Sequence, residues 1–182
     1  MRKREHQGAI RSGLPPDATA MQEVEAQAGR LFAAIGMETV ANEPPPELDD
    51  LRGYIDARNA WIFDAPNIGP VAYLLLADVD GKAHIEQMSV RPSHHRQGIG
   101  RALLEHAASV ARTRGYRAQT LTTFRDVPWN APYYVRLGFE VMSEEEIGPQ
   151  LKKVIDHERR FAEPRVAMGR TLRPPAPGPA RN

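Results

Sequence analysis

The residues that could do chemistry gather first in one stretch, RPSHHRQGIGRALL, from Arg91 to Leu104. Gly98 and Gly100 stand one residue apart, and an amphipathic helix pattern begins directly behind them. The first N–H groups of a helix have no partner within it, and the helix dipole favours negative charge there. Glycine lets an anion approach the backbone closely. Taken alone, this turn is equally typical of a phosphate site and of a plain helix start.

Two common nucleotide-binding turns do not fit this stretch. The dinucleotide fingerprint ends in Gly or Ala, but Leu103 occupies that place. Thr120 and Thr122 stand where the fingerprint requires an acidic residue about twenty residues later. The mononucleotide P-loop closes with Gly-Lys-Ser/Thr, whereas this chain has Gly100-Arg101-Ala102. Any phosphate held here therefore belongs to a different kind of ligand.

A second motif, WNAPYYVRLGFE from Trp129 to Glu140, follows the glycine turn. Together with Val90-Arg91-Pro92 and the run from His95 to Gly100, it resembles the GNAT superfamily of acyl-CoA-dependent N-acetyltransferases. The resemblance covers about sixty residues in the order strand, glycine turn, helix, strand, Asn/Tyr helix and Gly-Phe strand. His95 departs from the family pattern, which has Arg or Gln at that place.

The resemblance implies an α/β (α+β layered) fold. Its centre would be a mixed, mostly antiparallel sheet of about 6–7 strands flanked by helices, splayed between the strands at 82–90 and 116–124. It also implies acetyl-CoA as cosubstrate, with the diphosphate on the glycine-turn N–H groups and the pantetheine beside the strand that ends at Val90. Arg91 and Arg136 are further candidate cations. The expected cofactor-binding residues are Met88, Val90, His95, Arg96, Gln97, Gly98, Ile99, Gly100, Arg101, Ala102, Asn130 and Tyr134.

Two residues are the candidates for proton transfer. An alkylamine has a pKa near about 10, so a base must remove a proton before the amine attacks. Glu86, with His84 on the same side of its strand, is the expected base, acting through water. By resemblance Tyr134 is the acid that protonates the leaving thiolate. Asn130 either bonds the pantetheine or simply caps the helix that follows it.

The expected reaction is direct attack of a primary amine, free or in a peptide, on acetyl-CoA in a ternary complex. Asp126 and Trp129 lie in the loop before the Asn/Tyr helix, where an acid and an aromatic ring could hold a cationic amine. Both could equally be ordinary loop and core residues. The alternative function is a non-catalytic acyl-CoA-binding sensor or regulatory module of the same fold.

Periodicity predicts the elements that position these residues. Between residues 82 and 90, apolar residues change phase near Glu86 to Met88, which indicates a β-bulge or a strand with two half-buried faces. The expected helices cover 17–36, 46–58, 99–115, 131–137 and 144–161. The expected strands cover 60–63, 71–78, 82–90, 116–124, 139–142 and 165–172.

Composition limits the remaining possibilities. The chain has 182 residues, a net charge of +1 and no cysteine, so disulfides, thiolate nucleophiles and nucleic-acid binding by bulk charge are not expected. No apolar run is long enough for a membrane span. Partial metal motifs at His84-Ile85-Glu86 and His157-Glu158 lack their further ligands, so no metal is expected. We expect a cytoplasmic protein whose edge strands would allow a homodimer. Its single domain would cover 9–172, between a flexible basic N-terminus at 1–8 and a Pro-rich disordered tail at 173–182.

Overall fold

The computed structural model describes residues 8–158 and 164–173. The chain divides into two compact units. Unit 1 holds the described residues of 1–77 together with 85–106, and unit 2 holds 78–84 and the described residues of 107–182.

The strands that lie wholly or mostly in unit 1 follow the spatial order β1-β2-β3-β4. Residues 78–84, at the end of β3 and the start of β4, belong to unit 2. β1 pairs antiparallel with β2, and β2 pairs antiparallel with β3 with a register shift between Phe63 and Asp64. Their bounds are β1 Ala9–Ser12, β2 Ala60–Ala65, β3 Gly69–Val79 and β4 Lys82–Val90.

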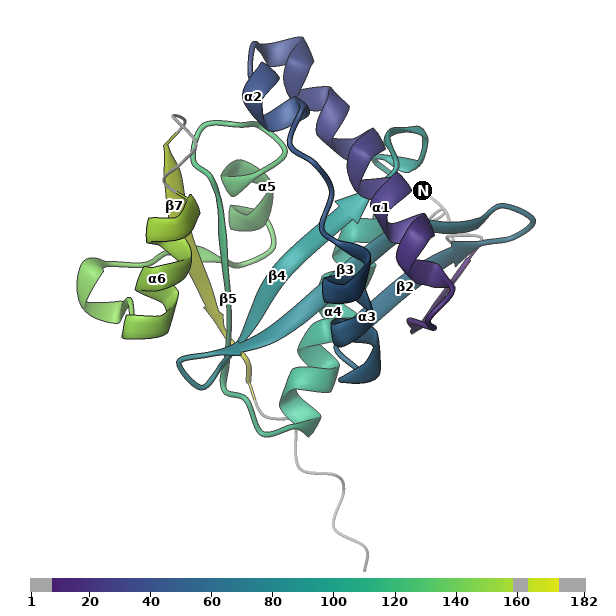
Figure 1. Ribbon diagram of the computed structural model, residues 1–182. Coiled ribbons are helices and arrows are strands. Elements are labelled where there is room, and N and C mark those ends of the chain that lie inside the picture. Colours follow the sequence, from purple (N-terminus) through teal and green to yellow (C-terminus); the bar gives the residue numbers. More distant parts are fainter. Residues whose placement is uncertain (1–7, 159–163, 174–182) are drawn as a thin grey trace, which may run out of the picture. The chain divides into compact units, whose positions relative to one another are not determined.

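The helices α1 and α3 bury their apolar sides on one core cluster of unit 1 (Figure 1). The chain from α1 continues as a 3₁₀ segment and ends at Gly36, whose φ of 78° is the left-handed conformation that favours glycine. The helical bounds are α1 Asp17–Gly29, η1 Arg30–Ile35, α2 Glu38–Ala41 and α3 Leu48–Asp56. The cluster contains Ala18, Met21, Val24, Leu51, Ile55, Ala60, Ile62, Tyr73 and Leu75.

The start of α1 is tied to the strands by Arg11. Its guanidinium donates to both Asp17 oxygens, at 2.6 and 2.9 Å, and to Asp64 at 2.5 Å. Burial raises the pKa of the Asp17 carboxyl, but hydrogen bonds from Arg11 and from the Leu14 N–H outweigh it and lower that pKa. The clamp therefore holds an ionised carboxylate at the point where β1 passes into α1.

The strands of unit 2 follow the order β5-β7-β6, and both pairings are antiparallel. Helix α6 packs along β7 (Figure 1). The helix α4, Ile99–Thr113, begins in unit 1 directly after the glycine turn, and its residues from Ala107 onward belong to unit 2. The other bounds are β5 Ala118–Phe124, α5 Ala131–Val135, β6 Glu140–Val141, η3 Glu144–Glu146, α6 Pro149–Glu158 and β7 Arg165–Thr171.

The predicted fold class is confirmed: the described residues contain seven strands flanked by helices in a GNAT-like α/β fold. Three local differences stand out. The short elements β1 and α2 were not expected, and the helix expected over 144–161 is broken at Ile147–Gly148 into η3 and α6. The last part of that expected helix, 159–161, lies outside the described residues. The splay between 82–90 and 116–124 and the boundaries of the single domain at 9–172 stay predictions. The termini at 1–7 and 174–182, including most of the expected tail, lie outside the described residues.

Candidate functional site

The glycine turn of unit 1 opens the helix α4. Arg96 and Gly98 both adopt left-handed backbone angles, with φ of 58° and 79°. Helical hydrogen bonding begins with the Ala102 N–H, which donates to the Gly98 carbonyl at 2.9 Å. The N–H groups just before Ala102 therefore have no acceptor within the helix. Because Gln97 and Gly98 are exposed, an anion can approach the turn from solvent.

His95 ties the turn to the preceding strand through its side chain. Its Nε2 lies 2.9 Å from the carbonyl oxygen of Val90, the last residue of β4. A carbonyl can only accept, so Nε2 carries the proton in this contact. His95 thus fixes the turn on the end of the strand, a role that its departure from the family pattern did not reveal.

The candidate cations differ in the side chains that they contact. Arg96 and Arg101 are exposed, and neither forms an ion pair with another residue in the described part of the chain. Arg91 instead turns to α1, where its Nη2 lies 3.4 Å from a Glu23 carboxylate oxygen. Arg136 in unit 2 lies 5.8 Å from the centre of the Tyr133 ring. Arg96 and Arg101 are therefore the cations available at the turn.

The strand β4 carries the expected base. Glu86 is exposed, and its charge adds to burial in raising the pKa of Tyr54 on α3 to about 12. Met88 and Val90 are half-buried further along the strand. The neighbouring candidate His84 is buried, because only 1% of its surface is exposed.

His84 is buried in unit 2, where its ring contacts Thr120. Its Nδ1 lies 2.9 Å from Thr120 Oγ1, and burial lowers its pKa to about 4. The ring is therefore neutral at physiological pH and enclosed within the protein. This leaves Glu86 as the solvent-exposed candidate base of β4.

Asn130 of unit 2 does not cap the helix α5 with its side chain. Its Nδ2 donates instead to Thr123 Oγ1 on β5 at 2.8 Å. Its Oδ1 is buried and has no hydrogen-bond partner among the residues that the structure describes. Since an unpaired buried acceptor is costly, this oxygen suits a ligand that brings an N–H donor, such as the amide of a pantetheine arm.

Tyr134 lies on α5, with its ring edge-on to Phe139 at 5.7 Å and to Tyr133 at 5.4 Å. Burial, followed by the neighbouring Tyr133, raises the pKa of the Tyr134 hydroxyl, and Arg165 opposes the rise only in part. The hydroxyl is therefore protonated at physiological pH. It makes no hydrogen bond to any other described residue, so its proton is available to a ligand.

The two expected acceptor contacts are less suited to binding a cation. The carboxylate of Asp126 forms a two-point ion pair with its neighbour Arg125, with both distances at 2.9 Å, and that bond lowers its pKa. Trp129 is 37% exposed. Asp126 therefore already has a counter-charge.

These groups fit the parts of coenzyme A, each within its own unit. The open N–H groups of the turn and the exposed Arg96 and Arg101 suit a diphosphate. The orphaned Asn130 oxygen suits an amide N–H. A model of the acetyltransferase (GNAT) family matches residues 25–139, which is more than half of the chain and includes both sets of groups. The chain belongs to this GNAT family.

Solved acetyltransferases show the same fold at low sequence identity. The GNAT acetyltransferase of Staphylococcus aureus Mu50 is 13% identical over 91% of this chain and 99% of its own, with a TM-score of 0.71. The PaiA N-acetyltransferase of Thermoplasma acidophilum, solved with coenzyme A, is 16% identical over 90% and 98%, with a TM-score of 0.67. The ribosomal-protein-S18-alanine N-acetyltransferase of Escherichia coli is 20% identical over 96% and 99%, with a TM-score of 0.61.

Over 8–158 and 164–173, no three or more His, Asp or Glu side chains come together in a way that could hold a metal ion. None of the helices in those ranges is both long and apolar enough to cross a membrane.

Sequence reasoning missed the polar groups that α1 and α3 bring to β4. Glu25 on α1 binds three side chains of β3 and β4, and Tyr54 on α3 responds to the charge of Glu86. Both residues sit in helices whose sequence shows only an amphipathic pattern. A polar residue at a helix-facing strand position, such as Ser89, was the one available signal.

Proposed function

We propose that this GNAT protein transfers an acetyl group from acetyl-CoA to a primary amine by direct attack in a ternary complex. The observation that carries the proposal is the hydroxyl of the half-buried Tyr134, whose pKa is raised by burial and which has no partner among the described residues. A sensor that only binds an acyl-CoA has no need of such a group. Membership of the acetyltransferase family adds independent support.

The binding roles follow from the environment of each residue. The N–H groups from Gln97 to Ala102 would hold the diphosphate, with Arg96 and Arg101 beside it. Asn130 Oδ1 would accept from a pantetheine amide, and the backbone of β4 near Met88 and Val90 would run beside that arm. When bound, acetyl-CoA supplies the acetyl group as an activated thioester.

The proton transfers involve two groups. Glu86 is exposed to water, so its carboxylate would take the amine proton through a water molecule. The Tyr134 hydroxyl would give its proton to the leaving thiolate sulfur, a thiol and a phenol having similar ordinary pKa values. The acetyl group passes directly to the amine nitrogen, so no acyl-enzyme is expected.

The test is thiol release from acetyl-CoA with four amines: benzylamine, spermidine, lysine and a short peptide that begins with alanine. We expect release that depends on one of these amines and yields its N-acetyl product by mass spectrometry. Coenzyme A binding by calorimetry without turnover on any amine would favour the acyl-CoA sensor. The cytoplasmic location and the homodimer remain expectations.

A further inference from the structure

The carboxylate of Glu25 is the centre of a hydrogen-bond network in unit 1. Its Oε2 accepts from the Tyr73 hydroxyl at 2.7 Å and from the Ser89 hydroxyl at 2.5 Å. Its Oε1 accepts from the Gln87 side-chain amide at 2.8 Å. Helix α1 is thus tied to β3 and β4 by a half-buried anion that three neutral donors surround.

This network fixes the orientation of the Gln87 amide. An ionised carboxylate has no proton to give, so the amide must turn its nitrogen, not its oxygen, toward Glu25. The same nitrogen also donates to Ser89 Oγ at 3.1 Å. A flipped amide would lose both bonds and place its oxygen against the carboxylate. The bonding pattern, rather than the placement of one atom, therefore decides which way the amide faces.

The oxygen of this amide is left available. In the described part of the chain no donor reaches Gln87 Oε1, and the atom is not among the buried unpaired ones. The side chain as a whole is half-buried. Gln87 therefore presents one oriented acceptor to solvent while its nitrogen is held inside.

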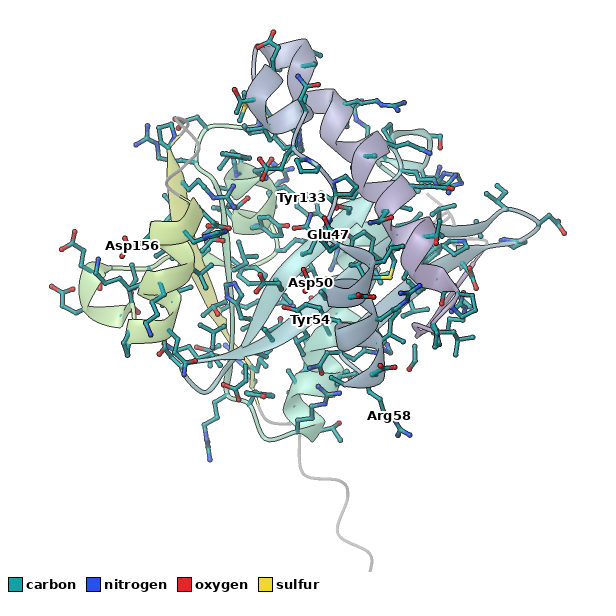
Figure 2. All side chains as sticks on the ribbon, viewed as in Figure 1. Glu47, Asp50, Tyr54, Arg58, Tyr133 and Asp156 are labelled. Carbon is teal, nitrogen blue, oxygen red and sulfur yellow. The ribbon has the colours of Figure 1, made fainter. Side chains whose placement is uncertain are left out.

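Gln87 is the neighbour of Glu86, the expected base, on β4. Tyr54 lies on α3 (Figure 2), and the charge of Glu86 reaches it. The Gln87 side-chain amide donates to Glu25 on α1. Both helices pack on one core cluster of unit 1, so each of the two neighbours interacts with a helix of that cluster. Adjacent residues of a regular strand point to opposite faces. The bulge expected near Glu86 to Met88 would bring both to one face, and it stays a prediction.

We propose that Gln87 Oε1 accepts a hydrogen bond from the acceptor amine and that Glu25 is the positioning residue that aims it. The inference rests on the proposed acetyl transfer. A neutral primary amine has two N–H bonds: Glu86 would draw on one through water, and Gln87 would hold the other. A secondary amine has only one N–H bond for the two acceptors. Gln87 is thus a specificity residue that favours primary amines.

The orientation is tested first without any substrate. In ¹⁵N-labelled protein the two Gln87 side-chain amide protons, assigned by their disappearance in Gln87→Met, should exchange slowly with water. In Glu25→Gln their exchange should quicken, because a neutral amide no longer dictates the orientation. Unchanged exchange in Glu25→Gln would overturn the role of Glu25.

The contact itself is tested by kinetics with the best of the four amines and its N-methyl derivative. In Glu25→Gln and in Gln87→Met we expect the KM for the primary amine to rise about 5- to 10-fold, as for one lost hydrogen bond. The kcat and the KM for acetyl-CoA should change less than about twofold. The preference for the primary amine over its N-methyl derivative should fall by a similar factor.

Glu23→Gln is the matched control. It changes the same residue type on α1, two residues away, at an exposed site whose carboxylate lies 3.4 Å from Arg91 Nη2. Its amine KM should equal that of the wild type.

A loss of stability in Glu25→Gln with no selective change in amine KM would reduce Glu25 to a structural residue. An unchanged KM in Gln87→Met would remove the amine contact while leaving acetyl transfer in place. Absence of turnover with all four amines in the wild type would overturn acetyl transfer and this contact together, while the exchange experiment would still decide how the amide is oriented.

Discussion

At the scale of single residues, Tyr134 carries the sharpest chemical prediction. Tyr134→Phe keeps the ring and its edge contacts to Phe139 and Tyr133 but removes the proton that would go to the thiolate. We expect kcat to fall roughly 10²-fold, the range typical of general acid catalysis. The affinity for coenzyme A, measured by calorimetry, should change little.

The matched control for this variant is Tyr133→Phe. It makes the same chemical change one residue away on α5, where the ring stacks near Arg136. Its kcat should stay within a few-fold of the wild type. Equal losses in both variants would mean that the hydroxyls act on the folding of α5 rather than on the leaving group.

His84 predicts how stability responds to pH. Burial lowers its pKa from 6.5 to about 4 in the folded chain, so the unfolded chain binds the extra proton first as pH falls. The contribution of the neutral His84 ring to the free energy of unfolding is complete above the pKa of the unfolded chain and is lost as the pH drops toward about 4. From pH 8 to pH 5 this amounts to about 2 kcal/mol.

The measurement is urea unfolding at several pH values for the wild type and His84→Gln. A glutamine can still bond Thr120 but does not titrate. Between pH 8 and pH 5, the free energy of unfolding of His84→Gln should therefore fall by about 2 kcal/mol less than that of the wild type. Parallel pH profiles for the two proteins would show that His84 does not become protonated on unfolding in this range.

The sequence predicts a site residue when the residues that it acts with are close to it along the chain. Gly98 and Tyr134 were found because each belongs to a short motif with fixed spacing. Glu25 was not, because its partners Tyr73 and Gln87 lie 48 and 62 residues away. Asn130 lies between these cases: the sequence left both a cap and a ligand contact open, and only the bond to Thr123 removes the cap.

At the scale of elements, the start of α6 depends on Asp80 of the β3–β4 turn. The Asp80 carboxylate accepts from the N–H groups of Gln150 at 3.0 Å and Leu151 at 2.9 Å, and the Gln150 side chain accepts from the Asp80 N–H at 2.9 Å. This reciprocal pair caps the helix from a distant part of the chain. A Cβ at Gly148 would overlap the Asp80 carboxylate.

Gly148→Ala should therefore lower the free energy of unfolding by about 1–2 kcal/mol, the usual cost of a lost helix cap. Urea unfolding at neutral pH measures it. Gly53→Ala is the matched control, because nothing lies within 4 Å of a Cβ at that exposed position of α3. That variant should be neutral or stabilising by up to about 1 kcal/mol. A neutral Gly148→Ala would show that Asp80 does not hold the helix in solution.

The same cap explains why the bounds predicted for this helix were wrong. Acidic residues at the start and bases toward the end of 144–161 suit one helix dipole, so a single helix was expected. The structure ends η3 at Glu146 and begins α6 at Pro149, where proline suits the first turn and Asp80 supplies the cap. Because Asp80 is about seventy residues away, no local pattern contains this signal.

At the scale of the whole molecule, ligand binding and stability are linked. A ligand that binds only the folded chain stabilises it by mass action, by about 2.7 kcal/mol at a hundred times its Kd. Coenzyme A should therefore raise the Tm of the wild-type chain, whatever the amine acceptor is. Observing this rise tests the binding half of the proposed function separately from turnover.

Variants of Gly98 test whether coenzyme A raises the Tm by binding at the glycine turn. With φ at 79°, any side chain there strains the backbone, so a loss of binding in Gly98→Glu alone would be ambiguous. Gly98→Ala carries the same strain without a charge. We expect Gly98→Ala to have a lower Tm that still rises with coenzyme A. Gly98→Glu should show no rise, because its carboxylate would face the diphosphate across the turn. If calorimetry found equal coenzyme A affinity in the two variants, the diphosphate would have to bind elsewhere on the chain.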